Sequence, residues 1–307
     1  MNRNVRLYIK SYFQDHFHKN VILYGPQIWL FLFLFLPFLI ILKISFAENI
    51  LNLPPISNLV EFLDDGVLKI SLSYQNYVTI FTDPFYINAL TSSLSLAFVS
   101  TGITLIMGYM MAYAMYRFPK KYHYLLLLLI MLPFWTSFLV RVYAWMNMLN
   151  STGLLNQILL SLYIIKEPLY LLDTKIAVIF GIVYCYLPFM VFPIFSSLEK
   201  IDPSYSEAAF DLGATPWQVF WRITVPLSYP GIISGCVLVF MPAIGEFVLP
   251  ELLGGPDTFT IGRALWMEFF NNRNWPLACA LAVLIVLPIL FISILLNKIG
   301  EDKKERV

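Results

Sequence analysis

The chain has 307 residues, of which 59% are hydrophobic and only 13% are charged, and its mean hydropathy is +0.73. Soluble domains carry roughly 25% charged residues, so this composition excludes an ordinary soluble protein and indicates an integral membrane protein. The net charge of +1 gives no general electrostatic attraction to nucleic acid, which is therefore not an expected partner.

Six apolar stretches are long enough to cross a bilayer, because a helix needs about 20 residues to span the hydrocarbon core. They lie at 22–46, 86–116, 124–148, 175–198, 229–250 and 276–297. We therefore predict an all-α polytopic membrane protein with six transmembrane helices in a domain at 22–297. Polar tails at 1–21 and 298–307 flank it. The first tail lacks the small-residue cleavage site of a signal peptide, so we expect the first span to be retained.

The distribution of Lys and Arg predicts the orientation of these spans. Thirteen of the twenty basic residues lie in segments that face the cytoplasm if the N-terminus does, and five lie in the opposite segments. The positive-inside rule therefore places both termini in the cytoplasm, together with a loop at about 199–228.

The longest outer loop, at 47–85, carries five acidic residues and one lysine. It ends in Asp83 and Pro84, a capping residue and a first-turn proline. This pair predicts that the second span begins there.

The cytoplasmic loop at 199–228 reads as two short helices joined by a turn. Asp202 starts the first helix, and Gly213 can adopt the left-handed conformation that ends it. Thr215 and Gln218 are spaced as a capping box for the second helix, which we expect to end before Pro226.

One face of the second short helix is aromatic, and it allows three interpretations. A DNA-binding helix–turn–helix is excluded because acidic residues outnumber the two basic ones nearby. A stiff connector needs the caps but not the large apolar side chains. An aromatic face can rest on the membrane interface or dock onto a partner protein. The residues of this face, at helical spacing, are Trp217, Phe220, Trp221 and Thr224.

The same loop resembles the EAA motif of ABC-importer permeases. The motif comprises Glu207, Ala208 and Ala209, then Gly213, and then Ile223–Pro226, with Val225 in place of the usual Leu. In that family the motif forms the coupling helix region, which docks into a groove on the ATPase subunit. The resemblance therefore implies these ATPase-coupling residues: Glu207, Ala208, Ala209, Gly213, Trp217 and Phe220.

Three longer stretches resemble polyamine permeases of the PotB/PotH type, and among them the putrescine subunits most. They are LPFWTSFLVRVYAW (132–145), YLPFMVFPI (186–194) and PAIGEFVLPELLGGPDTFTIGRALWMEFFNNRNWP (242–276). The resemblance implies a type I ABC importer permease with a MetI-like fold in the bacterial inner membrane. It also implies three kinds of partner: a second permease subunit, an ATPase dimer and a periplasmic polyamine-binding protein. The sequence has no phosphate-binding Gly-x-x-x-x-Gly-Lys-Ser/Thr motif, so we expect ATP and Mg²⁺ to bind the ATPase.

Two ionisable residues deep in the spans, Arg141 and Glu246, are the first candidates for the substrate pathway. Each lies 17 residues from the expected cytoplasmic start of its span, which is roughly 26 Å along a helix. The two either pair with each other, or Glu246 receives an ammonium group of the substrate at a broken helix. Four aromatic residues could line the path through cation–π contacts, and the last two are favoured because they reach the midplane: Trp135, Tyr143, Tyr184 and Tyr186.

Transport of spermidine or another small organic cation is the alternative to putrescine. Two further classes are a channel and an intramembrane enzyme. We predict no catalytic residues and no metal ligands, because His, Cys and carboxylate residues do not cluster in the sequence.

Overall fold

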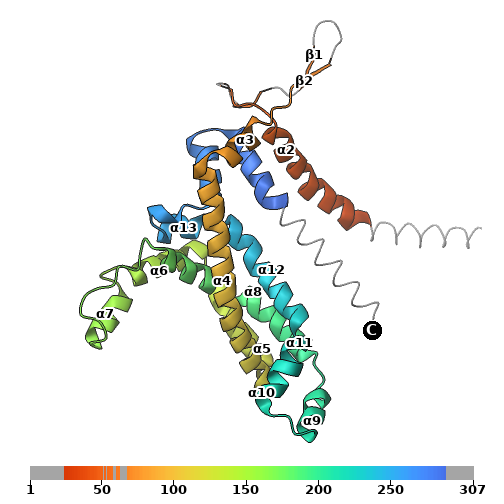
Figure 1. Ribbon diagram of the computed structural model, residues 1–307, viewed down its shortest axis with the longest axis vertical. Helices are drawn as coiled ribbons and strands as arrows, with labels where there is room; N and C mark the ends of the chain where they lie inside the picture. Colours follow the sequence, from red (N-terminus) through yellow and green to blue (C-terminus); the bar gives the residue numbers. More distant parts are fainter. Residues whose placement is uncertain (1–23, 51, 53, 58–59, 63–67, 288–307) are drawn as a thin grey trace, which may run out of the picture. The chain divides into compact units, whose positions relative to one another are not determined.

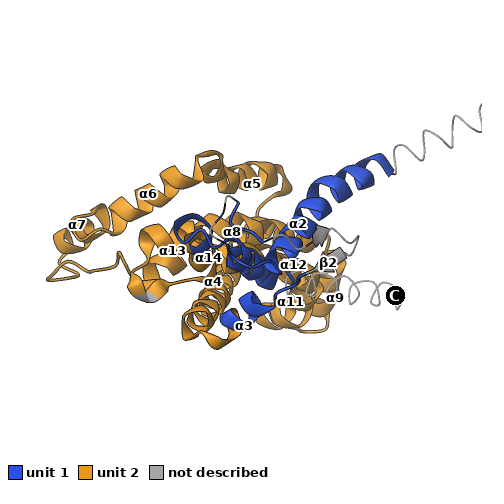
Figure 2. Cartoon of the chain, turned by 90° about the horizontal axis from the view of Figure 1, so that it is seen from above, with its two compact units in different colours: residues 1–79, 268–288 blue, residues 80–267, 289–307 orange. Residues whose placement is uncertain are grey.

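The computed structural model describes residues 24–287, except 51, 53, 58–59 and 63–67. The chain forms two compact units, coloured separately in Figure 2: residues 1–79 with 268–288, and residues 80–267 with 289–307. The predicted tails at 1–21 and 298–307 lie outside the described residues, as does the end of the predicted sixth span.

The first unit contains a continuous apolar helix at Tyr24–Ser45, which coincides with the first predicted span. This helix includes the π-helical turn η1 (Phe31–Phe35) and α2 (Leu36–Ser45). A two-stranded antiparallel hairpin follows, with β1 (Val60–Phe62) paired to β2 (Leu68–Ile70). The helix α3 (Gln75–Thr82) leads towards the second unit, and an apolar helix at Trp275–Leu287 completes the described part of the first.

Polar contacts fix the chain where α2 ends and α3 begins. The Asn76 amide donates hydrogen bonds to the carbonyls of Ser45 and Ala47, both at 2.9 Å. The Ser45 and Tyr77 hydroxyls lie 2.8 Å apart. These contacts satisfy backbone carbonyls that the end of a helix leaves without partners.

The second unit contains helices joined by loops, and its described residues form no β-strand. Its main elements in chain order are α4 (Pro84–Arg117), α5 (His123–Met131), α6 (Phe138–Leu149), α7 (Leu154–Ser161), α8 (Lys175–Glu199), α9 (Ser204–Asp211), α10 (Pro216–Val219), α11 (Val225–Leu227), α12 (Tyr229–Gly245), α13 (Val248–Leu253) and α14 (Ile261–Trp266). Short turns join several of these: η2 (Lys120–Tyr122), η3 (Leu132–Trp135), η4 (Phe220–Thr224) and η5 (Pro256–Thr258). The π-helical turn η6 (Met267–Asn271) begins at the last residue of this part of the second unit and otherwise belongs to the first. Asp83 caps α4 as predicted, accepting a hydrogen bond from the Phe85 amide at 2.9 Å.

The core of this unit is formed by α4, α8 and α12, which pack on one another (Figure 1). Met190 of α8 is fully buried at their junction. A Cβ atom on Gly108 of α4 would lie 2.7 Å from Met190 Cγ, and one on Gly235 of α12 would lie 2.7 Å from Met190 Sδ. The two glycines are therefore required for the three helices to approach this closely.

The predicted span at 124–148 is not one helix, which corrects the expectation from the sequence. It breaks between η3 and α6, and the two halves meet at an angle of 84°. Thr136 and Ser137 have extended backbone conformations at the break, and the Thr136 hydroxyl donates to the Pro133 carbonyl at 2.7 Å. Proline disfavours a continuous helix here because it has no amide hydrogen to donate.

The predicted span at 229–250 is also interrupted. The helix α12 ends at Gly245, Glu246 is extended with φ −64° and ψ 128°, and α13 begins at Val248. At its other end, α12 is bent by 63° relative to the helical segment Pro216–Leu227. The break at Glu246 agrees with the alternative that placed this residue at a broken helix.

Three helices are individually long and apolar enough to cross a membrane: Tyr24–Ser45, Pro84–Arg117 and Lys175–Glu199. Two more spans result if each of the two bent helix pairs crosses the membrane once; the pairs are Lys120–Trp135 with Phe138–Ser161, and Pro216–Leu227 with Tyr229–Gly245. The predicted helical architecture with membrane-spanning helices is therefore confirmed for the described residues, to which the structure adds the short hairpin and the two interruptions.

Candidate functional site

The first candidate region is the helical loop that contains the EAA motif, and local hydrogen bonds explain its shape. The Ser204 amide donates to Asp202 Oδ1 at 2.9 Å, and hydrogen bonds with Ser204 hold the pKa of the Asp202 carboxyl below its ordinary value. Gly213 has φ +82° and ends α9 in the left-handed conformation predicted for it. The Ala214 amide then closes the turn on the Ala209 carbonyl at 3.0 Å.

The second short helix starts as predicted but does not stop where predicted. Thr215 and Gln218 form the capping box. The helix then continues through Pro226 to Leu227, because the π-helical turn η4 intervenes between α10 and α11. In a π-helical turn the hydrogen bonds skip one more residue, which lets the helix accept a proline that lacks an amide hydrogen.

The aromatic face predicted on this helix divides into an inward and an outward part. The ring of Phe220 packs edge-on against Tyr109 and Tyr113 of α4, with ring centroids 5.7 and 5.1 Å apart. In contrast, Trp217 and Trp221 are 69% and 52% exposed. Phe220 is therefore an anchor between the loop and α4, whereas the two tryptophans form an exposed apolar surface.

The motif itself lies on the same accessible loop. Glu207 and Ala208 are exposed and Ala209 is half-buried. Leu212, next to the turn glycine, is 89% exposed and was missed in the sequence reading. A large apolar side chain directly before a helix-ending glycine, in a loop between two spans, was the available signal. Together, Leu212, Trp217 and Trp221 are called the docking surface below.

This loop is connected to the helical core by a second contact besides Phe220. The Tyr109 hydroxyl of α4 lies 3.1 Å from the hydroxyl of Ser228, which is fully buried at the bend between α11 and α12. The docking surface is thus joined to both α4 and α12. Figure 1 shows α9 and α10 at the end of the core where α4 terminates, away from α13.

The second candidate region surrounds Glu246, whose side chain is 9% exposed. The Tyr186 hydroxyl of α8 donates to Glu246 Oε2 at 2.5 Å. The amides of Val248 and Leu249 donate to Oε1 at 3.0 and 3.4 Å, so the carboxylate also caps α13. Its charge is favoured there by the positive end of the helix dipole. Glu246 and Tyr186 are called the carboxylate node below.

The approach of α14 completes the surroundings of the carboxylate node. The Thr260 hydroxyl donates to the Glu246 carbonyl at 3.2 Å. A Cβ atom on Gly262 would lie 2.5 Å from the Gly245 carbonyl oxygen, so only glycine permits this contact. The break after α12 is therefore held open by specific contacts.

Arg141 does not pair with Glu246, which decides one alternative that the sequence left open. Among the described residues, the ion pairs within 4.0 Å are His123 with Glu199 and Arg263 with Glu251. The Arg141 guanidinium instead lies over the rings of Phe134 and Phe138, at 5.0 and 5.7 Å. The count of 17 residues along a straight helix does not apply to Arg141, because the chain bends by 84° at 136–137.

The predicted pathway aromatics have different surroundings. Tyr184 packs edge-on against Trp145 at 5.3 Å, and both side chains are partly buried against the apolar core. Trp135 and Tyr143 are 75% and 50% exposed. Of the four, the structure brings only Tyr186 into contact with the Glu246 carboxylate.

Across the described residues, no three His, Cys, Asp or Glu side chains gather closely enough to hold a metal ion. His123 is buried at the start of α5, with Nε2 2.9 Å from the Phe118 carbonyl and Nδ1 3.4 Å from a Glu199 oxygen. Its contacts join the end of α8 to the loop before α5.

Known transport proteins are similar to this chain in sequence. The family described as binding-protein-dependent transport system inner membrane component matches residues 104–305. The chain is 38% identical over 280 residues to the spermidine/putrescine transport system permease protein PotB of Haemophilus influenzae, covering 90% of this chain and 93% of that protein. It is 40% identical over 255 residues to PotB of Escherichia coli, covering 83% and 88%.

Solved structures show the same fold at low sequence identity. A chain of a bacterial alginate ABC transporter, crystallised with its alginate-bound periplasmic protein, matches with a TM-score of 0.68 at 20% identity, covering 94% of this chain and 96% of that one. A chain of the MetNI methionine ABC transporter matches with a TM-score of 0.54 at 16% identity, covering 71% and 95%. The chain therefore belongs to the family of inner membrane components of binding-protein-dependent transport systems, which are transporter permease subunits and not enzymes.

Proposed function

We propose that this chain is the permease subunit of an ATP-driven importer that moves polyamines into the cytoplasm of a bacterium, with putrescine as the first substrate and spermidine as the alternative. The observation that carries this proposal is the identity of 38–40%, over most of the chain, to permeases named for spermidine and putrescine. The buried carboxylate of Glu246 at a helix break supports a cationic substrate, since intramembrane charges commonly mark substrate paths.

The proposed energy source is a separate ATPase dimer that binds ATP and Mg²⁺ and contacts the docking surface. Leu212, Trp217 and Trp221 support this role because exposed apolar and aromatic side chains are typical anchors of protein interfaces. The proposed membrane is the inner membrane, with both termini and the loop at 199–228 in the cytoplasm. A second permease subunit completes the path, and a periplasmic polyamine-binding protein delivers the substrate.

Glu246 and Tyr186 are the proposed substrate-contacting pair. In the structure each Glu246 oxygen already accepts a hydrogen bond, and Oε2 accepts only that of the Tyr186 hydroxyl among the described residues. An ammonium group that replaced this hydroxyl would keep the carboxylate paired. Tyr184 then contributes packing, while Trp135 and Tyr143 present aromatic faces at the surface of the second unit.

The experiment is reconstitution of the chain with its second permease, ATPase and binding protein in liposomes. We expect accumulation of labelled putrescine that requires both ATP and the binding protein, with spermidine taken up less well. Uptake without ATP would favour a channel. An importer that accumulates neither polyamine would refute the substrate assignment.

A further inference from the structure

Arg141 is a buried cation that forms no ion pair with the residues that the structure describes. Its side chain is 9% exposed, and its Nε atom is buried with no hydrogen-bond partner among the described residues. Its Cζ atom lies 5.0 Å from the centroid of the Phe134 ring and 5.7 Å from that of Phe138. The guanidinium is therefore held by the faces of two aromatic rings.

These two rings come from opposite sides of the break between η3 and α6. Phe134 belongs to η3 and is supported edge-on by Phe189 of α8 at 5.3 Å, whereas Phe138 is the first residue of α6. Ring faces attract any cation of suitable size, with a strength of about 0.5–2 kcal/mol per contact. Such contacts compensate only partly for the cost of removing a charge from water. Another cation can therefore replace the guanidinium over the two rings.

This aromatic pair is adjacent to the carboxylate node. Phe189 of α8 packs against Phe134 with ring centroids 5.3 Å apart and against Tyr186 at 6.2 Å, so a single ring separates the aromatic pair from the carboxylate node. A cation over the two rings and a cation at the Glu246 carboxylate therefore occupy neighbouring positions in the same part of the second unit. A molecule with two or more ammonium groups matches this arrangement.

We propose that Phe134 and Phe138 form a cation site for an ammonium group of the transported amine, and that Arg141 occupies this site as a tethered substitute when no substrate is present. The inference rests on the proposed polyamine function and adds a second contact point to it. Arg141 is then a specificity-determining residue, because only a cation that displaces its guanidinium from the faces of Phe134 and Phe138 binds at this site.

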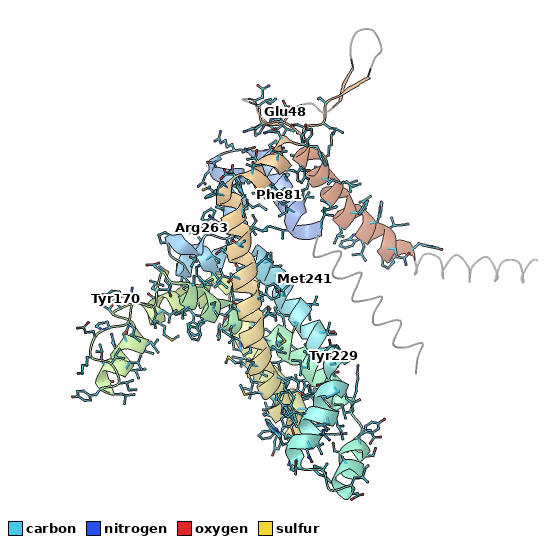
Figure 3. The ribbon with its side chains drawn as sticks, in the orientation of Figure 1. Glu48, Phe81, Tyr170, Tyr229, Met241 and Arg263 are labelled. Atoms are coloured by element: carbon cyan, nitrogen blue, oxygen red, sulfur yellow. The ribbon has the colours of Figure 1, made fainter. Side chains whose placement is uncertain are left out.

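The chain contains a matched control for this role. Arg263 of α14, labelled in Figure 3, also lies over an aromatic ring, that of Phe259 at 5.5 Å. Unlike Arg141, it forms an ion pair with Glu251. Its charge is therefore compensated within the chain, and we expect it to have no part in amine binding.

The test is equilibrium binding of labelled putrescine and spermidine to the complete complex of both permeases and the ATPase in nanodiscs, without the binding protein. Removing the tethered cation with Arg141→Gln should tighten binding by about threefold to thirtyfold, the range that one cation–π contact supports. Arg141→Met, which fills the volume with an apolar side chain, should have the same effect. Arg263→Gln should leave the binding constant unchanged.

Competition with methylguanidinium distinguishes a vacated cation site from a general change in structure. In Arg141→Gln, methylguanidinium should displace the labelled amine from the two rings. In the unchanged protein it should not change the amount of bound amine, because the Arg141 guanidinium already occupies the rings. Adding Phe138→Leu to Arg141→Gln should abolish both the tighter binding and the competition.

Unchanged or weaker amine binding in an intact Arg141→Gln complex would overturn the inference. Loss of the second permease from both Arg141 variants would also overturn it, because Arg141 would then serve a carboxylate of that subunit. A failure of the proposed function would be seen in a different experiment. In that case the reconstituted importer with the unchanged sequence would accumulate no polyamine.

Discussion

Replacing Tyr186 by Phe is the most direct test of the carboxylate node, since it deletes one hydroxyl and no packing atoms. That hydroxyl donates to Glu246 Oε2 at 2.5 Å, while both amide donors of α13 bind Oε1. The change therefore leaves Oε2 without its donor in a site where Glu246 is 9% exposed. A hydrogen bond to a charged group contributes about 1.5–3 kcal/mol.

This loss should lower the midpoint of thermal unfolding by roughly 3–12 °C, taking 2–4 °C for each kcal/mol in a domain of this size. The midpoint can be followed by size-exclusion chromatography of the heated, detergent-solubilised complex. Tyr184→Phe is the matched control, because Tyr184 is two residues away on α8 and has packing contacts but no hydroxyl hydrogen bond among the described residues. Its midpoint should change by less than about 1 °C, a surface-like effect.

Equal midpoints for Tyr186→Phe and the unchanged protein would refute the reasoning, because the Tyr186 hydroxyl would then contribute nothing to the folded state. Equal decreases in both tyrosine variants would refute it as well, since a general effect of removing hydroxyls from α8 would explain them.

Four further predictions concern coupling, topology, the outer face and the carboxylate. Gly213→Val should insert normally but abolish uptake, because a β-branched residue is strained at φ +82°, whereas Gly213→Asn should retain part of it; equal uptake by both would contradict the coupling role. Reporters fused after Lys121, after Gln218 and at the C-terminus should report cytoplasm, and those near Asp64 and Lys166 the periplasm; one inverted pair would require new span assignments. Crosslinkers at Asp64 and Asp257 should capture the binding protein, and capture from cytoplasmic loops alone would argue against that contact. Glu246→Gln should raise the polyamine concentration for half-maximal uptake and leave the abundance of the complex normal, because Glu246 and Arg141 are not paired in the described structure; a loss of abundance in Glu246→Gln that the added Arg141→Gln reverses would show that they are paired.

Local sequence signals predicted well wherever neighbouring residues determine the structure. The cap at Asp83, the left-handed Gly213 and the capping box of Thr215 and Gln218 all involve residues at most a few positions apart. Apolar length likewise located the helices, because hydrocarbon thickness imposes a minimum length on any span.

The interruption at 136–137 was not predicted, because hydrophobicity is nearly uniform across it, whereas the break at Glu246 is the broken helix of one of the two alternatives for that residue. Pro133 and the polar pair Thr136 and Ser137 were the only local signs of the 84° bend. Pro226 gave the opposite error: it was taken as a helix end, yet a π-helical turn carries the helix past it. The change from α-helical to π-helical hydrogen bonds in η4 depends on tertiary packing, and no simple sequence pattern indicates it.

The partners of the charged residues were also beyond sequence reasoning. Tyr186 and Glu246 are 60 positions apart, and their contact depends on how α8 and α12 are rotated about their axes. Similarly, Phe220 and Trp217 belong to one aromatic face by spacing, but only the position of α4 makes the first an anchor and leaves the second exposed.

The close packing at Met190 has a mechanical consequence. Gly108 and Gly235 lie so close to Met190 that even a Cβ atom would clash there, so sliding of α4 or α12 along α8 would bring larger side chains against Met190. We therefore expect the three helices to move as one stiff body. At 34 residues, α4 is about 50 Å long, so a small tilt caused at the docking surface displaces its far end by several ångströms. Force generated by an ATPase outside the bilayer could thus reach the opposite side of the membrane without any change inside the core.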